Sequence, residues 1–444
     1  MKWLRRFVSF LKIGVCAAVV IYLIKYPGQV QLDWFGYRLQ VSVVFFLAVL
    51  FVALGLVVFF IKIVKGLWSF PQRWAKCRQK KRRKSGEKAL LESLSAIAGG
   101  ELEEANKQAR IALKNLPEQP LSAVVAAQAA FMCGKTDEAL KCFQLLQQTP
   151  HTRFLGLRGE ALQALRQGDW STAQIALRQA ATLRPDSPWA LKHLFEADLR
   201  LGSYDRSEAV LKQLQTRKVI DAVQQRRYQA LVYWLKAQAA KLAHDPSRFS
   251  HYIKKAHDMA PELVAVAAQY AAYEIENDAA KHAKKILAAT WFYQPHPDLV
   301  VLFKKIATDK SPLDFYRYLA GVALADTNNV DANVILAEVA IAAKLWGQAR
   351  RHLHDVHQTQ ETQASCRLMA KLIRGESPHD ENAARTWEQK ALSVSPGSVW
   401  VCHQCHGQQA AWEVFCTHCG GLDTVTWSLP QATGAVKALL PQLI

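Results

Sequence analysis

The sequence lacks any set of residues whose spacing indicates an active site. No G-x-G-x-x-G motif follows a predicted strand, and strands and helices do not alternate. Serines and histidines occur, but no hydrolase or transferase motif brings them together along the chain. The chain is therefore not expected to be an enzyme, and its function has to lie in the surfaces it presents and the groups it holds.

The sequence also lacks a disulfide framework. Nine cysteines are present, of which four form two C-x-x-C pairs and five are scattered. An odd number without a paired framework argues against disulfide bonding and for a reducing compartment. The scattered five are interpreted as small buried apolar residues: Cys16, Cys77, Cys133, Cys142 and Cys366.

Acidic residues are absent from Lys62 to Lys84, where ten lysines and arginines occur. This run contributes to the formal net charge of +19 and directly follows a hydrophobic segment. The placement is typical of membrane topology, so no nucleic-acid partner is expected. The run either acts as a topology signal alone or contacts anionic lipid headgroups through a cluster of five cations. These are Lys80, Lys81, Arg82, Arg83 and Lys84.

Two apolar segments precede the basic run. Val41 to Ile61 is 21 residues without a charge, which at about 1.5 Å per residue crosses a hydrocarbon core of about 30 Å. Phe7 to Ile24 carries only Lys12, which can snorkel to the interface. No small-x-small cleavage site follows, so we expect a retained two-span hairpin rather than a signal peptide. The flanking positive charges predict that both termini are cytoplasmic, with an outer loop from about Lys25 to Gln40.

Four glycines that lie 34 residues apart predict helical hairpins of the tetratricopeptide type. They are Gly100, Gly134, Gly168 and Gly202. Five positions after each glycine stands a small residue, as closely crossing helices require: Ala105, Ala139, Ala173 and Ser207. Beyond Gly202 the spacing weakens, although helical patterns continue through Asp221–Leu242, Arg248–Met259, Glu262–Ala289 and Pro312–Ala325. A clearer unit returns at Asp331–Val356, and Thr362–Arg374 and Glu381–Ser393 form a last pair. We expect a solenoid whose concave face binds a protein segment.

The four paired cysteines have the spacing of a metal site. Cys402 and Cys405 are separated by ten residues from Cys416 and Cys419. Each pair places two thiolates on one tight turn, and two such turns complete a tetrahedron. Zn²⁺ is the expected ion, iron in the same S₄ geometry is the alternative, and haem is not predicted. A closed site of four cysteines favours a structural role over catalysis.

The residues around the cysteines suggest a small independent ribbon. Gly407 and Gly420 follow the two turns and are expected to adopt positive φ. Three tryptophans are expected to cover its core, and three histidines are interpreted as surface residues. Loss of the metal should then disorder this ribbon and leave the repeats helical. The tryptophans are Trp400, Trp412 and Trp427, and the histidines are His403, His406 and His418.

Together these features predict an all-α fold. Two transmembrane helices precede an α-solenoid of tetratricopeptide-like hairpins, and a zinc-ribbon or rubredoxin-like knuckle follows. The expected divisions are a membrane hairpin (residues 1–66), a basic linker (67–85), regular repeats (86–217), degenerate repeats (218–395), the metal ribbon (398–428) and a tail (429–444).

The chain resembles the bacterial HemY family over nearly all its length. The resemblance rests on the second span, the repeats, the segment from Trp400 to Trp427, and two motifs in the loop between the spans. These are Tyr26-Pro27-Gly28-Gln29-Val30-Gln31-Leu32 and Trp34-Phe35-Gly36-Tyr37. It implies a non-enzymatic scaffold in the bacterial inner membrane, associated with a late step of protohaem biosynthesis. Its partners would be haem-biosynthesis proteins bound at the cytoplasmic face.

A second similarity leaves other functions open. LapB-type regulators of lipopolysaccharide synthesis also combine an anchor, repeats and a Cys₄ end, but they have one span where two are predicted here. One alternative is therefore a regulatory adaptor that couples a membrane protease or a lipopolysaccharide-synthesis enzyme to its client. Another is a haem- or iron-binding redox protein that uses the cysteines.

Overall fold

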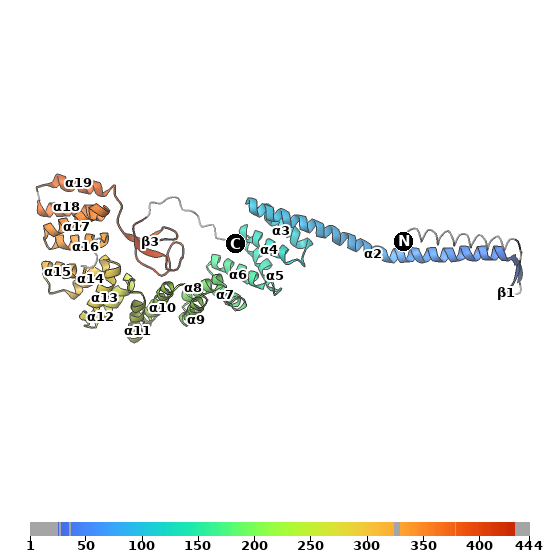
Figure 1. The fold of residues 1–444 in the computed structure, drawn as a ribbon, viewed down its shortest axis with the longest axis horizontal. Coiled ribbons are helices and arrows are strands. Elements are labelled where there is room, and N and C mark those ends of the chain that lie inside the picture. The colour runs from blue at the N-terminus through green and yellow to red at the C-terminus, as the bar shows by residue number, and fades with distance from the viewer. Residues whose placement is uncertain (1–24, 26–27, 35–36, 324–328, 378, 431–444) are drawn as a thin grey trace. The chain divides into compact units, whose positions relative to one another are not determined.

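The computed structural model describes residues 25, 28–34, 37–323, 329–377 and 379–430. The expected first span, Phe7–Ile24, lies outside these residues, as does most of the predicted tail. The chain divides into two compact units, Met1–Ala139 and Leu140–Ile444. The boundary falls within helix α5 (Thr136–Gln147), and each unit is described by itself (Figure 1).

In the described part of the first unit, a β-hairpin leads into a very long helix. Strands β1 (Gln29–Trp34) and β2 (Tyr37–Ser42) pair antiparallel, with Gln29 opposite Ser42. Helix α2 (Val43–Gly99) follows directly and has 57 residues. Within the described residues, its segment Val43–Lys62 is the one stretch long and apolar enough to cross a membrane, and none of it is buried in the protein. One of the two expected spans is thus present in the described chain.

Helix α2 joins this span to the repeats without a break. The expected linker, residues 67–85, is helical throughout. The helix ends at Gly100, whose φ of 77° permits the turn into α3 (Leu102–Asn115). The Ser93 hydroxyl of α2 donates to the Ala105 carbonyl of α3 over 2.9 Å. The end of α2 is therefore the first helix of the first hairpin, and α4 (Pro120–Met132) and α5 continue the array.

The second unit continues the expected α-solenoid. Ala139, Ala173 and Ser207, like Ala105, are completely buried, which confirms the small-residue positions of the repeat. Consecutive helices pack against one another as hairpins. They are α6 (Arg153–Gln167), α7 (Trp170–Leu183), α8 (Pro188–Arg200), α9 (Tyr204–Thr216), α10 (Ala222–Leu242), α11 (Pro246–Met259), α12 (Val264–Glu276), α13 (Ala280–Tyr293), α14 (Pro297–Ile306), α15 (Pro312–Ala323), α16 (Val330–Ala342), α17 (Trp346–Thr359), α18 (Gln363–Glu376) and α19 (Glu381–Ala391).

The later repeats keep the turn geometry of the earlier ones without their glycines. His244, Asp278 and Lys344 have φ of 55°, 60° and 56°, in the left-handed region. The residue after each one donates its backbone N–H to a carbonyl five positions earlier, as Leu345 does to Ala340 over 2.9 Å. His244 and Asp278 are again 34 residues apart. The repeat therefore persists in the backbone after the glycine signal has gone.

A three-stranded sheet follows the helices. Strands β3 (Val399–Cys402), β4 (Gln408–Gln409) and β5 (Val425–Ser428) lie in the order β4-β3-β5 and pair antiparallel. Trp400 of β3 stands opposite Gln409 on one side and Trp427 on the other. The solenoid is helical as expected, but the complete fold contains this sheet and the β1–β2 hairpin, which an all-α description omits.

Candidate metal centre

The two C-x-x-C turns have the same backbone conformation. Cys402 N–H donates to the Gly407 carbonyl over 3.0 Å, and Cys416 N–H donates to the Gly421 carbonyl over 2.9 Å. In each turn the residue after the second cysteine has positive φ, 58° at His406 and 73° at Gly420. The expectation was right for Gly420 and wrong for Gly407, because the left-handed position is one residue earlier in the first turn.

Gly407 is needed for a different reason. A Cβ atom at this position would lie 3.0 Å from the ring of His418 and 3.3 Å from the sulfur of Cys405. Its place in the turn thus permits close approach of the two knuckles. The three histidines near the cysteines are exposed, as expected.

The four sulfur atoms are arranged as a metal would require. All lie within 4.8 Å of one another, and they come from Cys402, Cys405, Cys416 and Cys419. The Cys402–Cys419 and Cys405–Cys416 sulfur pairs are each 3.7 Å apart. A tetrahedron with metal–sulfur bonds of about 2.3 Å has sulfur–sulfur edges of about 3.8 Å. The donor set fits a tetrahedral S₄ ion, which the geometry alone does not identify as zinc or iron.

Two of the thiols differ in their tendency to ionise. Burial would raise the pKa of Cys402, but its hydrogen bonds with Thr424 and with the amides of Cys405 and Gln404 lower it to about 6. Burial, together with the neighbouring cysteines, raises the pKa of Cys419 to about 12. Cys402 therefore forms a thiolate more readily than Cys419, because hydrogen bonds stabilise its charged form, whereas burial disfavours the charged form of Cys419. A bound cation would favour the deprotonated form of the thiols that hold it.

The ribbon, defined here as residues 399–428, is not the separate unit that the sequence suggested. Cys402, Trp412, Val414, Cys416 and Val425 belong to the same hydrophobic core as helices α10 to α18. Two further residues, Phe415 and Leu422, also pack against the core of α6 to α10. Solenoid side chains thus pack around Cys402 and Cys416, which are buried, while Cys419 stays exposed, and the ribbon covers part of the repeat surface.

Two arginines of the solenoid hold the second metal-binding turn. Arg227 of α10 donates from Nε and Nη2 to the Asp423 carboxylate over 2.5 and 2.9 Å, and from Nη1 to Glu262 over 3.2 Å. Arg200 of α8 donates to the Gly420 carbonyl. Its guanidinium also lies 4.0 Å from the ring centre of Phe415. The turn that carries Cys416 and Cys419 is therefore fixed to α8 and α10.

The ribbon tryptophans contact helices rather than only covering the ribbon itself. Trp412 meets Trp234 of α10 edge to face, with ring centres 6.0 Å apart. Trp427 contacts His296, the N-cap residue of α14, with ring centres 4.2 Å apart, and donates from Nε1 to Asp331 of α16 over 3.1 Å. His296 is 3% exposed, and burial lowers its pKa, so the ring is neutral in the interface. Together with the two arginines, these aromatic residues attach the ribbon to several helices between α8 and α16.

The basic cluster of α2 lies well beyond the membrane span along the helix. The five side chains Lys80 to Lys84 are exposed, and Arg83 pairs with Glu87 over 2.9 Å. Lys80 follows Lys62 by 18 residues, which corresponds to about 27 Å along a continuous helix. This cluster belongs to the first unit, whereas the four cysteines belong to the second.

These observations define a membrane-anchored helical-repeat protein with a cysteine knuckle built into its repeat core. Residues 28–134 match the family model described as the HemY protein N-terminus, and residues 164–232 match a tetratricopeptide-repeat model. The chain therefore combines a HemY-type N-terminal region with tetratricopeptide repeats.

Its curated and structural relatives are distant. The probable magnetosome protein Mms48 of Magnetospirillum gryphiswaldense is 23% identical over 428 residues, which cover 93% of this chain and 90% of Mms48. A solved structure of Naa15/Naa10 bound to HypK-THB has 15% identity and a TM-score of 0.44, covering 72% of this chain and 55% of that one. A tetratricopeptide repeat protein from Parabacteroides merdae has 13% identity and a TM-score of 0.31, covering 70% and 99%. These structural similarities carry no argument about function.

Proposed function

We propose that this protein is a non-enzymatic scaffold of the bacterial inner membrane that holds partner proteins at the cytoplasmic face. Its partners would be proteins of a late step of protohaem biosynthesis. The observation that carries the proposal is the match to the HemY N-terminus, in a chain whose helix α2 continues from an apolar span into a repeat array. In this proposal, the continuity of α2 would connect the repeats directly to the membrane span.

The proposed topology has two spans, with Phe7–Ile24 as the first and both termini in the cytoplasm. The basic run after Lys62 supports this orientation, because lysine and arginine accumulate on the cytoplasmic side. A cysteine-labelling experiment tests it. Cys77 is exposed on α2, so a membrane-impermeant thiol reagent should label it in inverted vesicles and spare it in intact cells.

The proposed ion is Zn²⁺, acting as a structural clamp. The four thiolates would hold the two turns together. The fixed turns would then place Asp423 against Arg227 of α10 and Phe415 against Arg200 of α8. When bound, the ion supplies four bonds that fix the ribbon. Metal analysis and the absorption spectrum of the purified protein test the alternative: cysteine-bound iron is coloured, whereas zinc is colourless.

Headgroup contact by Lys80–Lys84 is proposed as a secondary property. It requires α2 to incline, because a helix along the membrane normal would hold Lys80 about 27 Å beyond the span, outside the screening length of about 8 Å. A fluorophore on Cys77 and lipid-borne quenchers in anionic nanodiscs measure this inclination. Substituting the five cations with glutamine should reduce quenching if the headgroups hold them.

Affinity capture from native membranes tests the main proposal. The full chain with a C-terminal tag should recover late haem-pathway proteins. A control consisting of residues 1–85 retains the anchor but lacks the repeats, and it should not recover them. Capture of a membrane protease or of lipopolysaccharide-synthesis enzymes, without haem-pathway proteins, would replace the scaffold with the LapB-like regulatory adaptor. A haem spectrum in the captured protein would favour the redox alternative.

A further inference from the structure

Two hairpins of the array correspond residue by residue. Helix α3 (Leu102–Asn115) and helix α7 (Trp170–Leu183) have the same length and lie 68 residues apart in sequence. The same offset relates α4 (Pro120–Met132) to α8 (Pro188–Arg200). A difference of two repeat lengths therefore allows side chains at equivalent positions to be compared directly.

In the later hairpin an amide and an arginine hold a buried carboxylate. Gln174 donates from Nε2 to Asp198 Oδ1 over 2.5 Å, and Arg178 donates from Nη2 to the same oxygen over 3.2 Å. Asp198 is presented by helix α8 and is 1% exposed. Burial raises its pKa, while the bonds from Gln174 and Arg178 oppose that shift. The pair forms a receptor for a side-chain carboxylate carried on a helix.

In the earlier hairpin the amide and the arginine are present, but the carboxylate is missing. Asn106 and Arg110 stand at the equivalent positions of α3, whereas Ala130 of α4 replaces the aspartate. The two polar side chains reach Glu138 instead, over 3.4 and 3.5 Å, which are long contacts. Asn106 is 2% exposed, and its Oδ1 atom has no hydrogen-bond partner in the described part of the chain.

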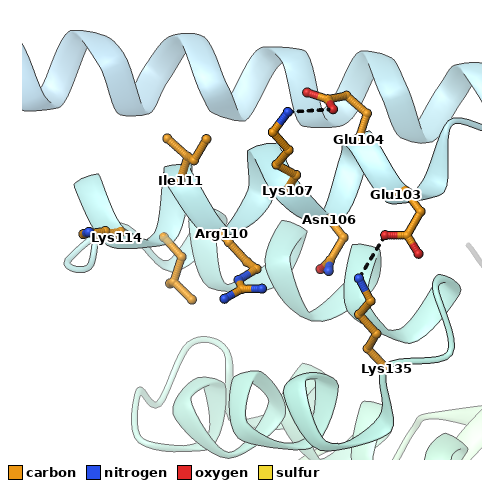
Figure 2. A pocket seen from close by; sticks show the side chains of 9 residues that line it. Glu103, Glu104, Asn106, Lys107, Arg110, Ile111, Lys114 and Lys135 are labelled. Carbon is orange, nitrogen blue, oxygen red and sulfur yellow. Dashed lines mark hydrogen bonds and ion pairs between the residues drawn. The ribbon is translucent and has the colours of Figure 1, made fainter.

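These residues line an open groove of about 740 Å³ on the first unit, shown in Figure 2. Two of its cations are already neutralised: Lys107 pairs with Glu104 over 3.2 Å, and Lys135 pairs with Glu103 over 2.9 Å. Lys114 makes no ion pair with any described residue. Arg110 has only the long 3.5 Å contact with Glu138 among the described residues, so the least neutralised positive charge of the groove lies at Arg110 and Lys114, beside the apolar side chain of Ile111.

We propose that this groove binds an acidic side chain presented by a helix of a partner protein. The carboxylate would bind Arg110 and the Asn106 amide nitrogen, as Asp198 binds their counterparts, and a donor on the partner would satisfy Asn106 Oδ1. Glu138 is the resident competitor and must be displaced. The inference rests on the scaffold function and gives its partner a specific chemistry.

A binding titration on the full-length protein in nanodiscs tests the inference. The probe is a fluorescent helical alanine–glutamine peptide with two central glutamates and an amidated C-terminus. Replacing Arg110 with glutamine removes a charged hydrogen bond and should weaken binding by about tenfold or more. Lys212→Gln is the matched control, because Lys212 stands three repeats after Arg110 and is exposed. Glu138→Gln removes the competitor and should strengthen binding.

A transplant variant supplies the converse test. Asn106→Gln with Ala130→Asp installs the amide and carboxylate of the later hairpin. The new aspartate should then bind Arg110 within the protein, and the affinity for the probe peptide should fall. Its helical circular dichroism should match the parent, which separates occupancy from misfolding.

Equal binding of a probe with glutamine in place of glutamate would overturn the inference, as would an Arg110→Gln variant that binds normally. Tighter binding of a glutamate-free peptide with a free C-terminal carboxylate would also overturn it, in favour of a chain terminus. Because the titration uses no haem-pathway protein, its outcome is independent of the affinity capture from membranes.

Discussion

The attachment of the ribbon to α10 can be measured by removing one side chain. In the Arg227→Ala variant, the Asp423 carboxylate loses both of its guanidinium bonds, of 2.5 and 2.9 Å. The side chain of Asp423 is 8% exposed and that of Arg227 is 26% exposed. The carboxylate would therefore be left largely buried without its counter-charge.

The expected cost follows from this burial. Removing one partner of a fully buried pair costs roughly 3–5 kcal/mol. Because Arg227 is about a quarter exposed, water can enter and solvate the remaining carboxylate, so we expect a smaller loss of about 2–3 kcal/mol. The loss falls on the docking of residues 399–428, since these are the residues that Asp423 connects to the solenoid.

Hydrogen exchange of the β3 and β5 amides measures this local stability in the metal-loaded protein. A loss of about 2–3 kcal/mol corresponds to exchange about 30- to 150-fold faster, at about 1.4 kcal/mol for each factor of ten. Arg226→Ala is the matched control, because Arg226 is an exposed arginine of the same helix. It should change the local free energy by less than about 0.5 kcal/mol.

Two outcomes would refute the reasoning. Equal exchange rates in the Arg227→Ala and Arg226→Ala variants would mean that the ion pair does not hold the ribbon. Fast exchange confined to α10, with unchanged ribbon amides, would mean that Arg227 stabilises its own helix through Glu262. A double-mutant cycle with Asp423→Ala isolates the interaction free energy between Arg227 and Asp423 from the other effects of each substitution.

Three further predictions concern the metal, the turns and pH. Cys402→Ser should expose not only the ribbon but also α10 to limited proteolysis, because Trp412 packs on that helix; cleavage restricted to the ribbon would restore the independent-domain model. Lys344→Gly should raise the free energy of unfolding by about 1 kcal/mol, since Lys344 has φ of 56°, and denaturant titration would reveal a neutral or harmful effect. Burial lowers the pKa of His257, so its contribution to stability is present above about pH 6.5, its value in the unfolded chain, and is lost as pH falls below it. His257→Gln should therefore reduce the loss of stability between pH 7.5 and pH 5.5, and an unchanged pH dependence would exclude this group.

The local features of the protein were predictable from short stretches of sequence. Gly100, Gly134, Gly168 and Gly202 each adopt the left-handed conformation that ends a helix, with φ between 69° and 77°. Each C-x-x-C pair forms a tight turn whose geometry depends on a few neighbouring residues. Such features are decided by backbone conformation within one turn of the chain, so spacing alone reveals them.

The later repeats were harder to recognise because their turns use other residues. His244, Asp278 and Lys344 adopt the same conformation as the glycines at some cost in free energy. The surrounding helix packing offsets that cost, and no sequence pattern records it. For the same reason Glu262–Ala289 reads as one helical stretch, although it contains most of α12 and α13.

The apolar span, the 34-residue hairpins and the cysteine tetrad could be read from the sequence, because each depends on composition or spacing along the chain. The packing of the ribbon into the solenoid core could be seen only in the three-dimensional fold. Arg227 and Asp423 are 196 residues apart, and neither carries a local signal for the other. The three-dimensional fold also shows that Asn106 and Arg110 lie at a groove without a buried carboxylate. Contacts of this kind arise from the packing of whole helices, which brings together side chains that the sequence keeps far apart.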